Sequence, residues 1–189
     1  MGQETISHVI GFDDAPFPPN HRGNVRVVGA VYSGLRLEGV LSGKVRRDGV
    51  NATRTLIELV SKSRFYPHIQ AIMIQGIAFA GFNVVDLKRL NKELQTAVMA
   101  IVRKAPNMEI IQKALLNNVR GGRAKWARIK RGGPVEPAAG VYVQRVGISR
   151  EAARELIWRL AVNSKIPEPL RTAHLIAGGI EVGKSRHRV

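Results

Sequence analysis

Two adjacent aspartates, Asp13 and Asp14, follow the apolar run Val9–Phe12 and come shortly before Pro16. In open α/β sheets, ligands bind beyond the carboxyl ends of the strands, so this position suits a functional site. A buried charge is costly unless a cation or hydrogen-bond donors compensate it, and carboxylate oxygens are ligands that Mg²⁺ accepts. The alternative is a turn, in which an aspartate side chain caps backbone donors. The pair therefore predicts either a divalent-metal site or a structural turn.

Other acids could complete a metal site from distant segments of the chain. Asp48 follows an expected hairpin strand, Asp86 closes the segment AGFNVVD, and Glu38 lies inside a strand. Each could equally be a cap or a surface charge, and Asp48-Gly49 is a common turn pair. The spacing of these acids does not choose among them.

One histidine lies on an expected helix. His174 stands among Leu170, Leu175 and Ile176, so it is either a packed core residue or a catalytic group. The other histidines offer no pair at the spacing of metal ligands, namely His8, His21, His68 and His187. The sequence also has no phosphate-binding Walker loop, GxSxG elbow or GxGxxG turn.

The charge of the chain is unusual. Its 30 Lys and Arg against 14 Asp and Glu give a formal net charge of +16, which favours a polyanionic partner and nucleic acid first. Residues 120–133, RGGRAKWARIKRGG, carry no acid, and glycine pairs bracket them. We expect a flexible basic loop that neutralises phosphates while Trp126 stacks on a base. The alternative is a solvated loop that keeps the protein soluble.

Two smaller basic segments accompany this loop. Arg46 and Arg47 lie beside Asp48, so they either pair with it or flank a nucleic-acid groove, and residues 184–189 form a basic tail. The expected nucleic-acid contacts are Arg46, Arg47, Arg103, Arg120, Arg123, Lys125, Trp126, Arg128, Lys130 and Arg131.

Several classes of protein are not indicated. No apolar run approaches the length of a membrane-spanning helix, and the first residues lack the pattern of a signal peptide, so we expect a cytoplasmic location. The absence of cysteine excludes disulfides, thiolate catalysis and cysteine-based zinc sites.

The elements that must position these residues alternate along the chain. Apolar and β-branched runs predict strands at 8–12 and 25–32, a hairpin partner after Ser33-Gly34, and strands at 71–74, 96–102 and 140–146. Helical periodicity is expected from Asn51, at 84–95 and 107–118, after Ser149 and after Pro167. This order predicts one α/β domain over residues 1–189, with a mixed sheet and helices on its faces.

Four segments together resemble an archaeal family catalogued as domain of unknown function 99, which is itself similar to endonuclease V: IGFDDAPF, VRRDGVNAT, IQGIAFAGFNVVD and SKIPEPLRTAHLIAGG. The resemblance spans nearly the whole chain. It implies a ribonuclease-H-like three-layer fold, in which a mixed five-stranded central sheet has antiparallel first strands and helices on both faces.

The resemblance also implies a site. It makes Asp13 a metal ligand and His174 an active-site histidine, with Mg²⁺ or Mn²⁺ activating a water that attacks a phosphodiester. Where endonuclease V has Val-Asp-Gly, this chain reads Ile74-Gln75-Gly76, so an uncharged amide replaces an aspartate. Endonuclease V also has a glutamate in the loop before its first helix, and Asp48 is the acid of this chain that lies nearest to that position. The expected catalytic residues are Asp13, Asp48 and His174, and the expected metal ligands are Asp13, Asp14, Asp48 and Gln75.

Three functions remain open at this point. The first is a nucleic-acid-binding protein that acts as a metal-dependent endonuclease with an altered active site. The second is a non-catalytic RNA- or ribosome-associated protein that keeps the fold but has lost the metal. The third is a pocket at the segment GIAFAGFN that binds a nucleotide or small molecule.

Overall fold

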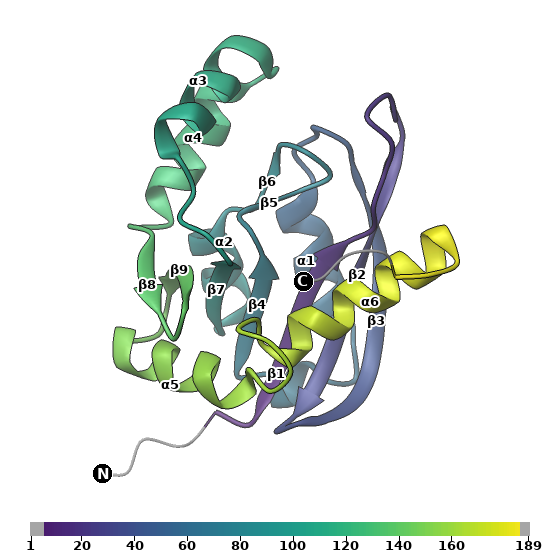
Figure 1. Ribbon diagram of the computed structural model, residues 1–189, viewed down its shortest axis with the longest axis vertical. Coiled ribbons are helices and arrows are strands. Elements are labelled where there is room, and N and C mark those ends of the chain that lie inside the picture. The colour runs from purple at the N-terminus through teal and green to yellow at the C-terminus, as the bar shows by residue number, and fades with distance from the viewer. Residues whose placement is uncertain (1–5, 186–189) are drawn as a thin grey trace.

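The computed structural model describes residues 6–185. Its main sheet has the strand order β3-β2-β1-β4-β7-β9-β8, and a separate two-stranded sheet is formed by β5 and β6 (Figure 1). The strands are β1 His8–Asp14, β2 Asn24–Ser33, β3 Arg36–Arg46, β4 Ala71–Gln75, β5 Ala78–Phe79, β6 Asn83–Val84, β7 Ala97–Val102, β8 Glu136–Ala138 and β9 Val141–Val146.

The main sheet is mixed, as predicted. Strands β1, β2 and β3 are antiparallel neighbours, β4 and β7 run parallel to β1, and β9 and β8 return antiparallel at the far edge. The expectation of five strands is wrong, because the hairpin β8–β9 pairs with β7 and extends the sheet to seven. Residues 140–146 were expected to form a last strand, and they do so as β9.

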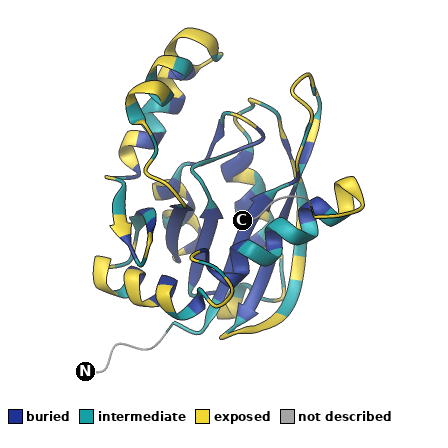
Figure 2. Ribbon diagram, in the orientation of Figure 1, coloured by how far each residue is buried: buried dark blue, intermediate teal, exposed yellow. Residues whose placement is uncertain are grey.

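Helices cover both faces of the sheet. On one face lie α1 (Ala52–Ser61) and α2 (Leu87–Leu94), whose leucines pack against Ile10 and Ile72. On the other face lie α5 (Arg150–Leu160) and α6 (Glu168–Val182), drawn nearest the viewer in Figure 1. Strand β4 is buried along both faces at the centre of the molecule (Figure 2), which explains its wholly apolar start.

The last helix lies very close to the first strand. A side chain at Gly11 would place its Cβ 2.4 Å from the carbonyl carbon of Pro169, so only glycine permits this approach. Farther along α6, the hydroxyl groups of Tyr32 and Thr172 are hydrogen-bonded at 2.6 Å. These contacts fix the position of α6 over β1.

The basic segment 120–133 is a helix for most of its length and not a loop. Helix α3 (Met108–Asn118) and helix α4 (Gly122–Arg131) form a hairpin that projects at the upper left of Figure 1. A Cβ at Gly122 would lie 1.7 Å from the carbonyl oxygen of Leu115. Gly122 therefore allows α4 to pack closely against α3. The expectation that the bracketing glycines make this segment flexible is not met at Gly122.

Two further expectations concern membrane spans and the basic tail. Across residues 6–185, no helix combines the length and hydropathy needed to traverse a lipid bilayer. Most of the predicted basic tail, residues 186–189, lies outside the described residues. A short 3₁₀ helix, Tyr66–His68, completes the elements.

Candidate active site

The predicted acid pair stands at the carboxyl end of β1. Successive side chains on a strand point to opposite faces, so Asp13 turns toward α6 with Val9 and Gly11. Asp13 is only 4% exposed, and its Oδ2 lies 2.8 Å from Nδ1 of His174. The structure thus brings together two of the predicted catalytic residues.

Asp14 lies at the opposite side of the strand end. Its Oδ2 accepts a hydrogen bond of 2.6 Å from the backbone N–H of Ala80. Burial raises the pKa of its carboxyl group from 3.8 to about 7; the Ala80 hydrogen bond opposes this rise and the negative charge of Asp13 adds to it. The two carboxyl groups therefore lie close enough for the charge of Asp13 to raise the pKa of Asp14.

Gln75 ends β4, the strand beside β1. Phe12 pairs with Ile74 in parallel register, so the next residues, Asp13 and Gln75, lie side by side and point to the same face. Oε1 of Gln75 is buried and has no hydrogen-bond partner in the described part of the chain. Leaving a buried acceptor unpaired lowers the free energy of unfolding by about 1–3 kcal/mol, so a ligand that binds this oxygen would stabilise the fold.

Asp48 is connected to this corner through a loop. Its N–H donates to the carbonyl oxygen of Ala80 at 2.9 Å, and its Oδ1 accepts from the N–H of Phe82 at 2.8 Å. Its Oδ2 lies 3.4 Å from Nε of Arg47. Asp14 and Asp48 therefore both bind the backbone of Ala80, Asp14 at its N–H and Asp48 at its carbonyl oxygen. The carboxylate of Asp48 is held by the N–H of Phe82 and by Arg47. Its backbone adopts a positive φ of 52°, as the predicted turn at Asp48-Gly49 requires.

The donor set for a metal is smaller than the sequence suggested. Between residues 6 and 185, no three His, Cys, Asp or Glu side chains form a group that could hold a metal ion. The oxygen-bearing side chains at the adjoining ends of β1 and β4 are Asp13, Asp14 and Gln75. Carboxylate and amide oxygens suit Mg²⁺, which usually keeps several waters, and the orphaned Gln75 oxygen fits such an ion.

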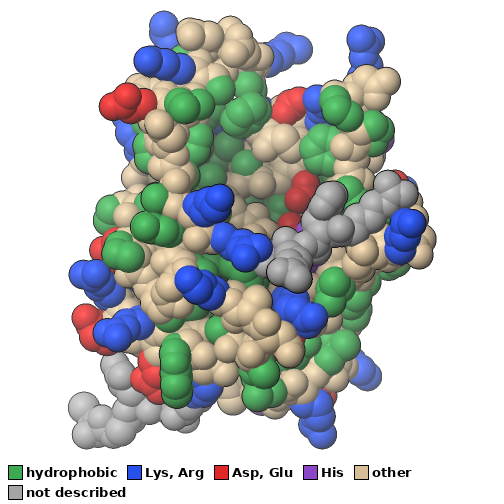
Figure 3. All heavy atoms as spheres, viewed as in Figure 1, with side chains coloured by type: hydrophobic (Ala, Val, Ile, Leu, Met, Phe, Trp, Pro, Cys, Tyr) green, Lys and Arg blue, Asp and Glu red, His purple; other side chains and the backbone are tan. Residues whose placement is uncertain are grey.

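The predicted basic contacts divide into surface and interior residues. Arg46, Arg103, Arg120, Arg123 and Lys130 are exposed. Arg131 is also exposed but forms an ion pair with Asp86, and Arg128 is half-buried. Figure 3 shows lysines and arginines spread over the face that also bears acidic and histidine side chains.

Three of the predicted contacts are engaged inside the protein. Lys125 is 1% exposed, and its Nζ donates to the carbonyl oxygen of Asp48. Trp126 packs, half-buried, against the cluster of Val84, Leu115 and Ile129. Arg47 donates to the carbonyl oxygens of the 19–21 turn and lies over the ring of Phe17, 5.6 Å from its centre. These three side chains stabilise the fold around Asp48 and α4.

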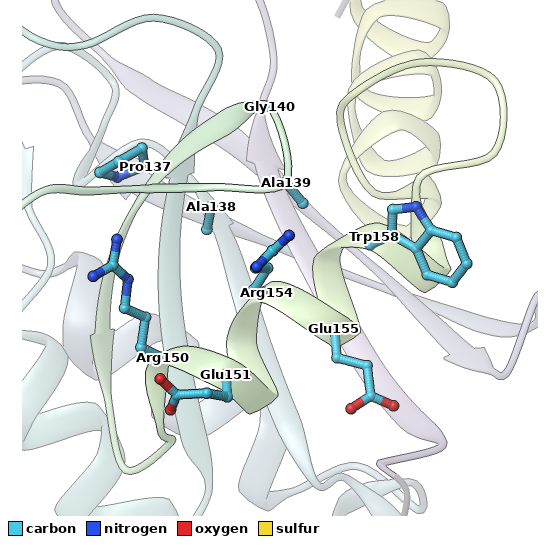
Figure 4. A pocket seen from close by; sticks show the side chains of 9 residues that line it. All are labelled: Pro137, Ala138, Ala139, Gly140, Arg150, Glu151, Arg154, Glu155 and Trp158. Atoms are coloured by element: carbon cyan, nitrogen blue, oxygen red, sulfur yellow. The ribbon is translucent and has the colours of Figure 1, made fainter.

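A large hollow lies away from these residues. It measures about 790 Å³ and lies between the β8–β9 hairpin and α5. Figure 4 shows that its polar side chains all come from α5, where Arg150 and Arg154 alternate with Glu151 and Glu155, and that Trp158 stands at one side. None of the predicted catalytic residues lines it, so size alone does not locate the chemistry.

Sequence reasoning missed the backbone groups of the 76–82 loop. The N–H of Ala80 and the N–H of Phe82 hold the two acids, and positive φ angles at Gly76 and Gly81 shape the loop. The glycines of GIAFAGFN were the available signal, because glycine is the residue that adopts positive φ without strain.

Comparisons with known proteins place the chain in a family. The family profile described as endonuclease dU matches residues 5–181. A UPF0215 protein of Deinococcus radiodurans is 49% identical over 180 residues, which are 95% of this chain and 92% of that protein.

Two solved structures share the fold. A protein of unknown function from Archaeoglobus fulgidus superposes with a TM-score of 0.86 at 30% identity, covering 92% of this chain and 98% of that one. Endonuclease V of Ciona intestinalis, in complex with DNA containing an inosine, gives a TM-score of 0.56 at 14% identity, covering 88% and 82%. The second likeness shows the fold alone. The match over 5–181 and the identity to the Deinococcus protein show that the chain belongs to the endonuclease dU family, which has members in both archaea and bacteria.

Proposed function

We propose that this protein is a divalent-metal-dependent endonuclease that hydrolyses a phosphodiester bond in nucleic acid carrying a deaminated base. Deoxyuridine in DNA is the substrate that the family description suggests first. The observation that carries the proposal is the buried Asp13 carboxylate, 2.8 Å from His174 at the carboxyl edge of the parallel strands. An acid and a histidine at that edge can hold a cation and move a proton.

Asp13, Asp14 and Gln75 would hold the metal. Each carboxylate oxygen can accept more than one partner, so the hydrogen bonds already present leave capacity on both acids. A bound Mg²⁺ or Mn²⁺ would supply Lewis acidity and lower the pKa of a water. The amide of Gln75 brings an oxygen without charge, so we expect weaker metal binding than a third carboxylate would give.

His174 is proposed to act on the proton of the attacking water. An ionised Asp13 carboxylate can only accept hydrogen bonds, so Nδ1 of His174 must be the protonated ring nitrogen. Asp13 thereby orients the imidazole ring of His174. This arrangement lets one carboxylate serve both the cation and the histidine.

The surface charge supports a nucleic-acid partner. A net charge of +16 attracts polyanions, and Arg123 and Lys130 on α4 are exposed to bind phosphate. Since Lys125 is buried on the same helix, we propose that it supports Asp48 and does not contact phosphate.

Cleavage assays test the proposed function. Labelled single-stranded and duplex DNA and RNA containing one deoxyuridine or uridine, one inosine nucleotide or no deaminated base are incubated with Mg²⁺, Mn²⁺ or EDTA. We expect metal-dependent cleavage beside the deaminated base, lost in Asp13→Asn and kept in the matched control Glu136→Gln, whose partner is Arg145. Cleavage that persists in EDTA or in Asp13→Asn refutes the proposal. Salt-dependent binding without cleavage would identify a non-catalytic binding protein instead.

A further inference from the structure

A second cavity lies between the sheet and the α3–α4 hairpin. It measures about 240 Å³ and is lined almost entirely by apolar atoms. Ala100, Tyr142 and Gln144 form its sheet wall, and Met108 and Ile129 form its helix wall. Figure 3 shows hydrophobic side chains gathered in the hollow beside this hairpin, with acidic side chains below them.

This cavity adjoins the candidate active site through the 76–82 loop. Ala78, Gly81 and Phe82 line the cavity, while Ala80 of the same loop donates to Asp14 and Phe82 donates to Asp48. A group inside the cavity and a phosphate beside Asp14 would therefore contact the same loop. The segment GIAFAGFN, expected to form a ligand pocket, supplies one wall of this cavity.

Gln144 presents one polar atom at this apolar wall. Its Nε2 donates to the carbonyl oxygens of Ile129 and Gly133, at 3.1 Å and 2.7 Å. Both partners can only accept, so the amide orientation is fixed and both Nε2 hydrogens are used. No hydrogen bond within the described residues reaches the remaining atom, Oε1. Gln144 lines the cavity and its two hydrogen bonds hold the amide in place, so its Oε1 is a preorganised acceptor.

We propose that this cavity receives the deaminated base, extruded from its strand, and that Oε1 of Gln144 accepts a hydrogen bond from the base's ring N–H. The proposal rests on the proposed endonuclease function. A base that is read on its Watson–Crick edge must leave the stack, and apolar and aromatic side chains such as Phe82 and Tyr142 are typical of pockets that receive it.

The chemistry of deamination explains why an acceptor would discriminate. In cytosine and adenine the ring nitrogen on the pairing edge carries a lone pair. In uracil and hypoxanthine the same nitrogen carries a hydrogen. A fixed carbonyl oxygen pairs with the deaminated base and faces a lone pair in its parent, which leaves the acceptor unpaired once the base covers it. Gln144 would thus be a residue that determines specificity and takes no part in bond cleavage.

The test compares two substrates on one variant. Single-turnover cleavage and binding are measured with DNA carrying deoxyuridine or N3-methyldeoxyuridine, in which a methyl group replaces the ring N–H hydrogen. We expect the wild-type protein to prefer deoxyuridine by roughly tenfold to a hundredfold. Gln144→Met should reduce that ratio to near one, whereas the control Gln112→Met on α3 should keep it.

The preference for deoxyuridine over N3-methyldeoxyuridine distinguishes a role of Gln144 in recognising the base from a role in stabilising the fold. Loss of the Ile129 and Gly133 hydrogen bonds lowers the stability of Gln144→Met but affects both substrates equally. Equal cleavage of the two substrates by the wild-type protein overturns the role of Gln144 while the proposed function stands, and this measurement needs no variant. An unchanged preference in Gln144→Met also overturns it, because the methyl group is then excluded by bulk. Failure of the wild-type protein to cleave any of the deaminated substrates refutes both proposals, whereas cleavage of inosine substrates alone would overturn only the recognition of uracil.

Discussion

The side chains of Asp13 and His174 meet at 2.8 Å although 161 positions separate them in the chain. One belongs to the end of β1 and the other to the middle of α6, and the close approach of α6 at Gly11 holds the two elements together. The site therefore depends on the docking of the last helix onto the first strand. Any change that shifts α6 changes the distance on which the proposed chemistry depends.

Replacing the histidine tests whether it does more than pack. We expect His174→Gln to lower the rate of cleavage by about 10²- to 10⁴-fold, the range of general acid–base catalysis, with affinity for DNA retained. Single-turnover rates and thermal unfolding of the same preparation give both quantities. A purely structural histidine would instead produce a lower melting temperature and normal cleavage by the molecules that remain folded.

The buried Gln75 oxygen predicts a metal-linked stability. Without metal, Gln75→Asp places a third carboxyl group beside Asp13 and Asp14, so we expect it to cost about 1–3 kcal/mol of unfolding free energy. Millimolar Mg²⁺ or Mn²⁺ should restore that stability, because the added charge binds the cation. Gln75→Leu removes the unpaired acceptor and should reduce stabilisation by metal below that of the wild-type protein. Identical responses of all three proteins to metal in thermal unfolding would contradict the assignment of Gln75 as a ligand.

Much of this site could be predicted from local sequence patterns. The apolar runs before Asp13 and at 71–74 place two strand ends, and the Pro-rich start of 167–182 marks the helix that carries His174. These patterns are reliable because a buried central strand requires apolar residues and a helix start tolerates proline. The pairing of Asp13 with His174 came from the family resemblance and not from spacing.

The remaining features depend on contacts between distant segments. Gly122 was interpreted as a flexible point because sequence shows a glycine but not the Leu115 carbonyl beside it. Lys125 is expected to contact nucleic acid because it stands in a basic segment, but its partner, the carbonyl of Asp48, is a backbone atom that no side-chain pattern reveals. The donors to Asp14 and Asp48 are also backbone groups. Residue identity could not indicate any of them.

Asp14 predicts a dependence of stability on pH in the absence of metal. Its folded pKa of about 7 exceeds the ordinary value of 3.8, so the native state binds more protons between these values than the unfolded state does. The unfolding free energy should therefore fall as the pH rises from about 4 to about 7, by up to the order of 4 kcal/mol. Urea unfolding in EDTA across this window measures the slope, and Asp14→Asn should flatten it. Parallel profiles for the two proteins would contradict the prediction.

The exposed and the buried cations of helix α4 should differ in their effect on nucleic-acid binding. Arg123→Gln and Lys130→Gln remove exposed cations, so each should weaken binding at low salt and reduce the slope of log affinity against log salt by about one. Lys125→Met should leave that slope unchanged but lower the unfolding free energy by about 1–3 kcal/mol, because the carbonyl of Asp48 loses its donor. Fluorescence anisotropy at several salt concentrations, together with urea unfolding, measures both effects. If Lys125→Met alone reduced the slope, the buried lysine would have to turn outward to bind phosphate, and its role in supporting Asp48 would be wrong.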